Sequence, residues 1–507
     1  MMRIANAVLL VIWCACPAIA APKALPDAVY QDKVQGAWLG KCIGGALGMP
    51  IESWRYWDIE KNYPNITGYL GYFDDRWVGW SGVVKAESIP TNGEWRHVRV
   101  VVRVPDFDAA RVFAVPIIGM SHEYSKSPAC WEIRGVRIVR PKSDITFSPE
   151  DWVANSASSW QADNVVRFDF DGSRSWARMR TQSARKLQLK PGDSVLLIFE
   201  ARWISGDSRI GFAFDYDSVN SRKGFKPDDD TTYQIVGLHA LETYGPGLTA
   251  AQIGREWCAH LPSVSNKLAE GIALERMRSG IEPPKSGEHE IGEAIGGQMK
   301  GEIWGLICPG RPDLAAEYAR RDGVVAHCRN GVYGEQFIAA MMSAAFHEKS
   351  IPKLIETGLS AIPNDSKYAE VIREVVATHA RGTDWREVRK IVVDKYPGIC
   401  NPVYSEAALV TLALLYGDGD FEKSINIAAR CGNDTDCNAA SVGALIGCIH
   451  GARAIPTKWK EPIGDSFRCF ASGMEEWRIS DLAKRICAAG RKTLEYHGDG
   501  VRFAEAK

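Results

Sequence analysis

Hydrophobic residues recur along this chain with two different periods. In residues 30–48, and again from 234 almost to the C-terminus, they recur at helical spacing. Between these regions, from about residue 73, apolar and polar residues alternate with a period of two, as at Val98, Val100 and Val102. The change of period predicts an α+β multidomain protein in which an all-β block interrupts a helical region.

The helical periods set bounds for individual helices. We expect helices at 30–48, 234–244, 250–261, 268–279, 291–307, 313–322 with 324–327, 333–347, 367–380, 384–395 and 405–416, and one that begins at Asn438. No strand pattern alternates with them, so this part predicts an all-α bundle and not a βαβ sheet. Gly40, Gly44 and Gly48 are costly in a helix unless another backbone packs against them, so we also expect a close helix neighbour there.

The all-β block contains strand patterns at 98–104, 131–139, 166–170, 194–204 and 210–216. Short strands separated by turns predict a two-sheet β-sandwich. The stretch W-E-I-R-G-V-R-I at 131–138 resembles strands of carbohydrate-binding jelly-roll modules. We expect most tryptophans of the block to lie in its core, with a sugar-stacking platform as the alternative: Trp77, Trp80, Trp95, Trp131, Trp152, Trp160, Trp176 and Trp203.

The N-terminus has the pattern of a secretory signal at 1–20. Arg3 precedes a short apolar run, and A-I-A at 18–20 provides a cleavage site before Ala21. We therefore expect a secreted or periplasmic protein without a membrane span, and a lipoprotein anchored through Cys16 is the alternative. The expected domains are the signal at 1–20, a discontinuous all-α domain at 21–75 and 222–507, and an inserted β-sandwich at 76–221.

Composition favours a globular enzyme. The net charge of −1 shows no basic excess, so nucleic acid and anionic membrane surfaces are not expected partners. The 13 cysteines, 11 without the signal, form no C-x-x-C pairs, so they predict neither a disulfide framework nor a zinc site. Cys42, Cys448 and Cys487 lie on apolar helical stretches and are interpreted as small buried hydrophobic residues.

A polar turn at 431–438, C-G-N-D-T-D-C-N, directly precedes a small, apolar and glycine-spaced helix pattern. An Asp before a helix is ordinary, because its side chain accepts a bond from a free backbone N–H. That interpretation explains one acid but not both Asp434 and Asp436, since neighbouring carboxylates repel each other unless a cation offsets their charge. Hard cations such as Mg²⁺ take oxygen ligands of this kind, so the turn predicts a metal site.

A second acidic turn, K-P-D-D-D-T-T-Y at 226–233, leads into the helix expected at 234–244. Asp228, Asp229, Asp230 and Thr231 are its candidate ligands. The alternative is a solvated turn whose negative charges interact favourably with the helix dipole and stabilise the helix by about 0.3–1 kcal/mol per charge. Two such turns far apart in sequence predict facing halves of one binuclear site, in which two ions bind a water or a substrate oxygen between them.

Three motifs resemble the ADP-ribosylglycohydrolase family, which includes the dinitrogenase reductase-activating glycohydrolases. They are G-K-C-I-G-G-A-L-G-M-P-I-E at 40–52, D-D-T at 229–231 and G-N-D-T-D-C-N-A-A at 432–440, in the family's order. The stretch 304–346 is similar to the bacterial branch of the family. The resemblance covers the chain before about residue 72 and after about 224, and it implies the family's all-α catalytic fold.

The resemblance also implies roles for individual residues. Glu52, in the family's P-x-E position, takes a catalytic or metal-gating role, with a surface loop acid as the alternative. The implied cofactor is two Mg²⁺ ions at the acidic turns, with Mn²⁺ as a second choice. His327 stands at the family's histidine position, with a helix-packing histidine as the alternative. The candidate substrate contacts are His327, Asn330, Tyr333, Glu335 and Asn438.

The sequence departs from the family pattern at two positions. Many members have aspartate where this chain has Gly45. Many have threonine where it has Cys437, at the second ion. Because a thiol is a soft ligand and Mg²⁺ a hard ion, we expect Cys437 not to bind Mg²⁺ through sulfur. The alternative is a site that prefers a softer ion such as Mn²⁺ or Zn²⁺.

The resemblance implies a glycosidase that releases ADP-ribose from a protein or small molecule by cleaving a ribofuranosyl bond, through an oxocarbenium-like state helped by a carboxylate. Export conflicts with that substrate, because ADP-ribosylation is mostly an intracellular mark. The alternatives are a secreted furanosidase that acts on glycans and a non-catalytic glycan-binding protein. The intact acids Glu52, Asp229 and Asp434 argue against the last of these.

Overall fold

The structure is a computed structural model of the chain. It describes residues 24–52, 56–70, 85–88, 90–103, 112–121, 127–140, 143–146, 152–154, 158–160, 165–170, 176–181, 187–189, 194–218, 224–262, 268–396, 402–498 and 503–504. The expected signal at 1–20 and both expected domain boundaries lie outside the described residues, as do Trp77 and Trp80. Those expectations stay predictions.

The described residues on either side of the β block are mainly helical. The α-helices are α1 Asp27–Gly48, α2 Tyr56–Asn62, α3 Asp229–Tyr244, α4 Ala250–His260, α5 Ala269–Arg278, α6 Gly301–Ile307, α7 Pro312–Ala326, α8 Asn330–Ala344, α9 Ile351–Ser360, α10 Lys367–Ala380, α11 Trp385–Lys395, α12 Val403–Gly417, α13 Phe421–Arg430, α14 Thr435–His450, α15 Thr457–Ile463 and α16 Ile479–Tyr496. The 3-10 helices are η1 Met49–Ile51, η4 Lys285–Gly287 and η5 Ile295–Lys300.

The helix expected at 291–307 is divided into η5 and α6, and this prediction was wrong in its continuity. Gly296 and Gly297 disfavour a continuous α-helix. A Cβ at Gly297 would lie 2.3 Å from the carbonyl oxygen of Gly331, so η5 follows the backbone of α8 closely. The helix expected from Asn438 instead begins at Thr435, directly after the acidic turn. The other predicted helices are present within a few residues of their expected bounds.

Helices α1 and α14 pack with their backbones in contact through glycines. A Cβ at Gly40 would lie 1.9 Å from the carbonyl oxygen of Gly443, and one at Gly44 would lie 1.9 Å from that of Ala439. A Cβ at Gly48 would lie 2.2 Å from the carbonyl oxygen of Thr435. The predicted close helix neighbour of α1 is therefore α14, although the sequence did not identify it.

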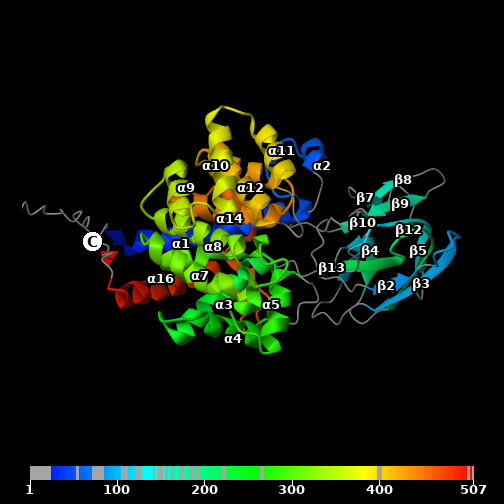
Figure 1. Ribbon diagram of the computed structural model, residues 1–507, viewed down its shortest axis with the longest axis horizontal. Helices are drawn as coiled ribbons and strands as arrows, with labels where there is room; N and C mark the ends of the chain where they lie inside the picture. Colours follow the sequence, from blue (N-terminus) through cyan, green and yellow to red (C-terminus); the bar gives the residue numbers. More distant parts are fainter. Residues whose placement is uncertain are drawn as a thin grey trace, which may run out of the picture.

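The strands between the two helical regions form two antiparallel sheets (Figure 1). The first sheet has the order β2 Lys85–Ser88, β13 Arg209–Ser218, β4 Val112–Ser121, β10 Trp176–Thr181 and β7 Trp152–Ala154, with β11 Leu187–Leu189 beside β4. The second has the order β3 Arg96–Arg103, β12 Ser194–Gly206, β5 Ala129–Arg140, β9 Val166–Phe170 and β8 Ser158–Trp160, with β6 Ser143–Thr146 beside β5. All five strands predicted from the period-two pattern are present.

Two small sheets lie in the rest of the described chain. They pair β1 Leu25–Pro26 with β16 Phe503–Ala504, and β14 Ser466–Arg468 with β15 Glu476–Arg478. Among the described residues no helix combines the length and the apolar character needed to cross a membrane. Cys42, Cys448 and Cys487 are free and buried, as predicted.

Trp95 and Trp131 are two of the β-region tryptophans with described contacts. Trp131 is fully buried and its ring lies 4.7 Å from that of Phe168, so it is a core residue. The guanidinium groups of Arg134 and Arg202 lie 4.1 Å and 4.8 Å from the ring centre of Trp95. Arginine side chains therefore occupy positions over Trp95 that a stacked sugar would need.

Candidate metal centre and active site

The two acidic turns meet at one place in the helical region. Three groups of side chains each have ligand atoms that all lie within 4.8 Å of one another: Asp228, Asp229 and Asp230; Asp230, Asp436 and Cys437; and Glu52, Asp434 and Asp436. Asp230 belongs to the first two groups and Asp436 to the last two. The seven residues therefore form one continuous set, which we call the acidic cluster.

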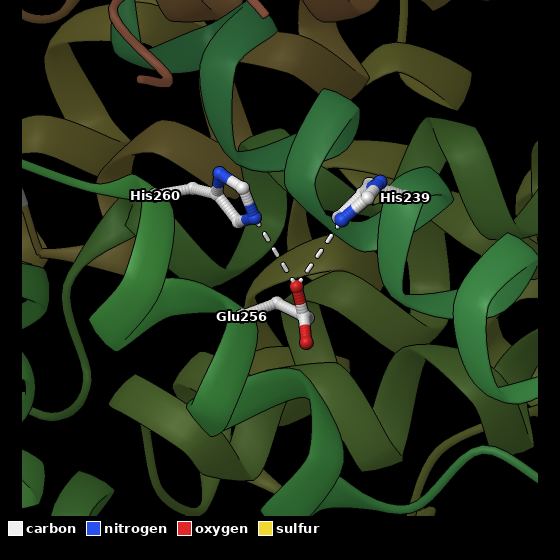
Figure 2. A group of neighbouring side chains, drawn as sticks. All are labelled: His239, Glu256 and His260. Carbon is white, nitrogen blue, oxygen red and sulfur yellow. Dashed lines mark ion pairs between the residues drawn. The ribbon is translucent and has the colours of Figure 1, made fainter. Parts of the chain in front are cut away.

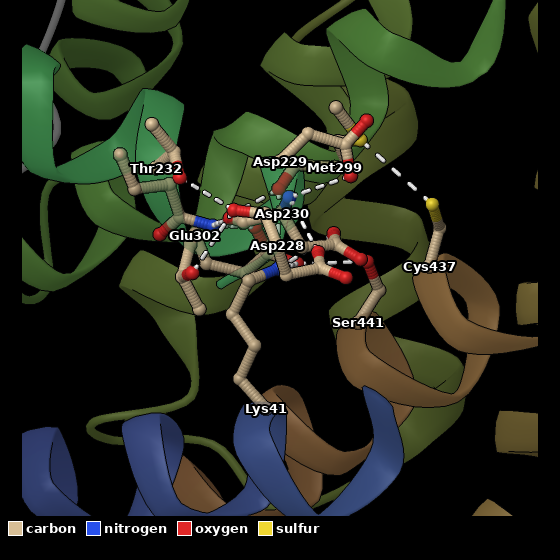
Figure 3. A network of polar contacts seen from close by, with 11 residues as sticks. Lys41, Asp228, Asp229, Asp230, Thr232, Met299, Glu302, Cys437 and Ser441 are labelled. Carbon is tan, nitrogen blue, oxygen red and sulfur yellow. Dashed lines mark hydrogen bonds and ion pairs between the residues drawn. The ribbon is translucent and has the colours of Figure 1, made fainter. Parts of the chain in front are cut away.

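The first half of the acidic cluster is the N-terminus of α3 (Figure 3). Asp228 is the N-cap of α3, and its carboxylate accepts a hydrogen bond from the backbone N–H of Asp230 at 2.8 Å. The hydroxyl of Thr231 donates to the carbonyl oxygen of Asp228 at 3.2 Å. Ordinary helix capping therefore explains the position of Asp228, and it also places Asp229 and Asp230 on the first turn of α3.

The second half of the acidic cluster is the turn before α14. Gly432 and Asn433 have positive φ angles of 75° and 63°, which reverse the chain before Asp434. The hydroxyl of Thr435 then donates to the carbonyl oxygen of Gly48 at 2.9 Å. This bond joins the turn to the end of α1, so Glu52, four residues later, lies beside Asp434 and Asp436.

Glu406 of α12 holds the same turn from its other side. Its buried carboxylate accepts hydrogen bonds from the side-chain amides of Asn433 at 3.1 Å and Asn438 at 2.7 Å. Asn438, a candidate substrate contact, is thus engaged in supporting the turn. Glu406 was not among the predicted site residues, although an acid in the mainly apolar stretch 405–416 is a signal of a buried polar role.

Lys41, which the sequence analysis also missed, extends from α1 into the acidic cluster (Figure 3). Its Nζ lies 3.1 Å from Asp230 Oδ1 and 3.4 Å from Glu302 Oε1, and all three side chains are at most 2% exposed. Burial lowers the pKa of Lys41, but the two carboxylates outweigh burial and raise its pKa overall. Lys41 therefore offsets part of the negative charge of the cluster. The sequence signal for a buried role of Lys41 was its position within the mainly apolar, glycine-spaced stretch 40–48.

The carboxylates of the acidic cluster fit a bound cation. Oδ2 of Asp230 and Oδ1 of Asp436 are buried and have no hydrogen-bond partner among the residues that the structure describes. Burial, together with Asp434, raises the pKa of Asp436 well above its usual range, and burial and Asp230 raise the pKa of Asp229 to about 7. Buried carboxylate oxygens without partners are costly, and a hard divalent cation takes ligands of this kind.

Cys437 differs from the other members of the acidic cluster. Its Sγ lies 3.8 Å from Met299 Sδ, and the thiol is almost completely buried. Burial, followed by the charge of Asp230, raises the pKa of the Cys437 thiol well above its usual range. A protonated thiol beside a thioether provides a soft, apolar side to the cluster, whereas the carboxylates provide hard oxygen ligands.

The candidate substrate contacts near the start of α8 lie in other polar networks. Nε2 of His327 lies 3.0 Å from Glu270 Oε1, and the charge of Glu270 contributes to the raised pKa of Asp229. The charge of Glu270, the partner of His327, therefore acts on the acidic cluster at Asp229. Glu335 is fully buried and lies 3.3 Å from Lys300 Nζ, so it belongs to an internal ion pair.

Asn330 and Tyr333 are the two remaining candidate substrate contacts. The side chain of Asn330 donates to Glu293 at 2.9 Å and accepts from the backbone N–H of Tyr368 at 2.9 Å, which connects α8 to α10. Tyr333 is partly buried against the hydrophobic core. Neither residue belongs to the groups of possible metal ligands found among the described residues.

Comparison with known proteins identifies the family. A profile of the ADP-ribosylglycohydrolase family matches residues 26–96 and 174–494, well over half of the chain. The chain belongs to the ADP-ribosylglycohydrolase family. Membership indicates a glycohydrolase, in a family that is typically metal-dependent and acts on small-molecule substrates, and the acidic cluster provides candidate metal-binding groups. The described part of 97–173, which lies between the two matched ranges, includes strands of both sheets.

The chain was also compared with solved structures and with curated proteins. A solved structure described as an ADP-ribosylglycohydrolase-related protein complex is 20% identical in sequence and covers 52% of this chain and 81% of its own, with a TM-score of 0.39. The family assignment rests on the sequence profile. No curated protein matches the chain.

Proposed function

We propose that this ADP-ribosylglycohydrolase-family protein hydrolyses a ribofuranosyl glycosidic bond, of the ADP-ribosyl type, at a binuclear Mg²⁺ site. The observation that carries the proposal is the continuity of the acidic cluster. Asp230 and Asp436 each belong to two groups of neighbouring ligands, and each has a buried carboxylate oxygen that accepts no hydrogen bond from the described residues. An arrangement of shared carboxylates suits two hard ions close together.

The residues that would hold the ions come from both turns. We assign Asp228, Asp229, Asp230 and Thr231 to one side of the site and Asp434 and Asp436 to the other. When bound, the two ions supply positive charge that neutralises these acids and attracts the vicinal hydroxyls of a furanose. Cys437 stays a protonated thiol, because its sulfur is soft and contacts Met299.

Glu52 is the proposed catalytic carboxylate. It directly follows η1 and is itself partly exposed, and its carboxylate lies within 4.8 Å of ligand oxygens of Asp434 and Asp436. Glycosidic cleavage develops positive charge at the anomeric carbon, which a carboxylate stabilises. Glu52 combines access from solvent with proximity to the buried acids, whereas Asp434 and Asp436 are enclosed.

A secreted furanosidase that acts on glycans is the second candidate. The pattern of an export signal at 1–20 and the strands at 97–173, which the family profile does not match, favour it. In this version the strands between residues 85 and 218 form a jelly-roll-like sandwich that recruits glycan, and the furanosyl group of the glycan enters the same acidic cluster. The two candidates share their metal chemistry and differ only in the leaving group.

A substrate screen distinguishes these candidates. Release of ADP-ribose from ADP-ribosyl-arginine and ADP-ribosyl-serine would be measured beside hydrolysis of nitrophenyl furanosides, each with Mg²⁺ and after chelation. Mg²⁺-dependent turnover of the ADP-ribosyl compounds alone is expected. Turnover of the furanosides alone would favour the glycan hydrolase, and no turnover of either class would contradict the proposed reaction.

A further inference from the structure

A second group of possible metal ligands lies in the C-terminal half of α3 and on the neighbouring α4. His239 of α3 and Glu256 and His260 of α4 have ligand atoms that all lie within 4.8 Å of one another (Figure 2). Nε2 of His239 lies 3.2 Å from Glu256 Oε2, and Nε2 of His260 lies 3.3 Å from the same oxygen. His239 follows Asp230 by nine residues on α3, about 13 Å along the helix axis, so this cluster is separate from the acidic cluster.

The hydrogen bond on the far side of His260 fixes the state of its ring. Nδ1 of His260 lies 2.9 Å from the carbonyl oxygen of Ser472. A carbonyl oxygen only accepts, so Nδ1 must carry the proton. In the neutral ring, Nε2 then directs a lone pair toward Glu256 Oε2, which is itself an acceptor. Two acceptors facing each other are stable only if a positive charge lies between them, either a second proton on the imidazole or a metal ion.

The other carboxylate oxygen of Glu256 is also fixed. The hydroxyl of Tyr244 donates to Glu256 Oε1 at 2.7 Å, which leaves Oε2 for the two histidines. The hydrogen bond that His260 donates to the Ser472 carbonyl and the one that Glu256 accepts from Tyr244 thus orient the ligand groups, as outer partners usually do at zinc sites. The side chain of Glu256 is 11% exposed, and those of His239 and His260 are 30% and 25% exposed. One side of the cluster therefore faces solvent.

We propose that His239, Glu256 and His260 form a second metal site that binds a borderline divalent ion such as Zn²⁺, with solvent completing the coordination. Two imidazole nitrogens and one carboxylate suit zinc, whereas Mg²⁺ prefers oxygen ligands alone. Glu256 and His260 are four residues apart and so lie on one face of α4. An ion there would connect α3 to α4, and through the Ser472 carbonyl to the loop before β15. It would stabilise the position of α3, whose first turn contains Asp229 and Asp230.

The test is metal binding to the full chain, with the acidic cluster saturated by excess Mg²⁺. After removal of transition metals by a chelator, Co²⁺ should bind with one equivalent and give the visible absorption of a low-symmetry nitrogen site, and Zn²⁺ should displace it. Zn²⁺ should also raise the melting temperature. Both effects should be absent in His239→Gln and His260→Gln, and Tyr244→Phe should weaken binding by about 10- to 100-fold.

Two control variants separate this site from the others. His450→Gln removes an exposed histidine of α14 and should retain both the Co²⁺ absorption and the Zn²⁺ stabilisation. Asp436→Asn alters the acidic cluster and should retain them as well. Circular dichroism checks that each variant is folded, and Glu256→Gln replaces any histidine variant that is not.

The wild-type protein alone can overturn the proposal. If it binds less than one equivalent of Zn²⁺ at micromolar free ion, His260 and Glu256 form a charged hydrogen-bonded pair without a metal. Co²⁺ absorption that persists in folded His239→Gln and His260→Gln would place the ion elsewhere and would equally reject the site.

Discussion

At the scale of single residues, the acidic cluster includes one thiol besides its carboxylates, and a buried lysine lies against it. Lys41 lies against Asp230 and Glu302 in a fully enclosed position, and Cys437 lies against Met299. Neither side chain provides an oxygen ligand, but each alters the charge or the set of ligands around the carboxylates. Lys41 adds a fixed positive charge, and Cys437 removes a hydroxyl that could have bound a hard ion. Three predictions follow from Glu52, Cys437 and Lys41.

Glu52→Gln should abolish most turnover and leave melting temperature and Mg²⁺ content nearly unchanged. Glu52 is only partly buried, and the enclosed acids are the proposed ligands, so the change should remove a catalytic charge and little else. Initial rates on the active substrate, with metal analysis of the same samples, check this. Glu356→Gln, an exposed position on α9, is the matched control. Near-wild-type rates in Glu52→Gln would eliminate the proposed role.

Cys437→Thr should tighten Mg²⁺ binding and keep activity, because a hydroxyl replaces a soft sulfur beside Asp230 and Asp436. Titration of the chelated protein with Mg²⁺, monitored by activity and calorimetry, measures the change. Loss of activity that added Mg²⁺ does not restore would mean that sulfur is a working ligand for a softer ion, such as Mn²⁺ or Zn²⁺.

Lys41→Met should destabilise the metal-free protein by about 3–5 kcal/mol, because removal of one partner leaves buried charges uncompensated. Urea unfolding with a chelator present measures the free energy of unfolding. Excess Mg²⁺ should recover part of the loss, since the ion supplies positive charge to the same carboxylates. Lys390→Met, which removes an exposed ion pair with Asp394, should change stability little. Equal stability of Lys41→Met and wild type would show that the buried lysine is dispensable.

At the scale of elements, the contact between α1 and α14 sets the geometry of the site. The two helices approach until backbone meets backbone, and the bond from Thr435 to Gly48 joins the start of α14 to the end of α1. This contact brings the segment that carries Glu52 to the turn that carries Asp434. Glycines at four-residue spacing therefore act on the site through helix packing, without contacting a ligand themselves.

Gly44→Ala should separate α1 from α14 and lower stability by about 1–3 kcal/mol or more, the usual cost of overpacking. The added Cβ would lie 1.9 Å from the Ala439 carbonyl oxygen, and backbone cannot yield as a flexible side chain does. Thermal unfolding measures the effect. Gly68→Ala is the matched control, because a Cβ there meets no atom of the described residues within 4 Å and its φ is not positive. A similar melting temperature for the two variants would contradict the packing argument.

At the scale of the whole molecule, helices from both ends of the chain enclose a set of acids that would repel one another without a cation. Residues separated by the entire β region, such as Glu52 and Asp230, belong to the same cluster. Two buried carboxylate oxygens of the acidic cluster lack hydrogen bonds among the described residues, and charge repulsion between Asp228 and its neighbours adds to the cost. Folding and metal binding should therefore be coupled.

Mg²⁺ should raise the melting temperature of the wild-type protein, and a chelator should lower it. Binding to the folded state alone stabilises by about 2.7 kcal/mol when the ion is present at 100 times its Kd. Asp436→Asn should lose most of this response, whereas Asp365→Asn, an exposed acid, should keep it. Differential scanning calorimetry over a Mg²⁺ series measures the response. A wild-type melting temperature independent of Mg²⁺ would contradict a hard-ion site in the acidic cluster.

The sequence by itself determined the local features. Period determined which segments are helices and which are strands, because the side of an element that is buried must repeat with the geometry of that element. Asp228 at the start of α3 and the glycines of α1 were also predictable, since capping and close packing each leave a local pattern. Six of the seven acidic-cluster residues were candidates because each lies in a short motif of charged or sulfur ligands next to a helix start, whereas Glu52 was a candidate only through the family resemblance.

Only the tertiary structure decided which of these features meet. Lys41 and Glu406 contact the acidic cluster or its supporting turn from α1 and α12. The sequence near each of them does not show which side chains it contacts. The three-residue cluster of His239, Glu256 and His260 was invisible for the same reason, because one ligand lies on α3 and two on α4. Contacts between distant segments depend on which helix faces pack together. A single sequence shows which residues form each helix face, but it does not show which other helix packs against that face.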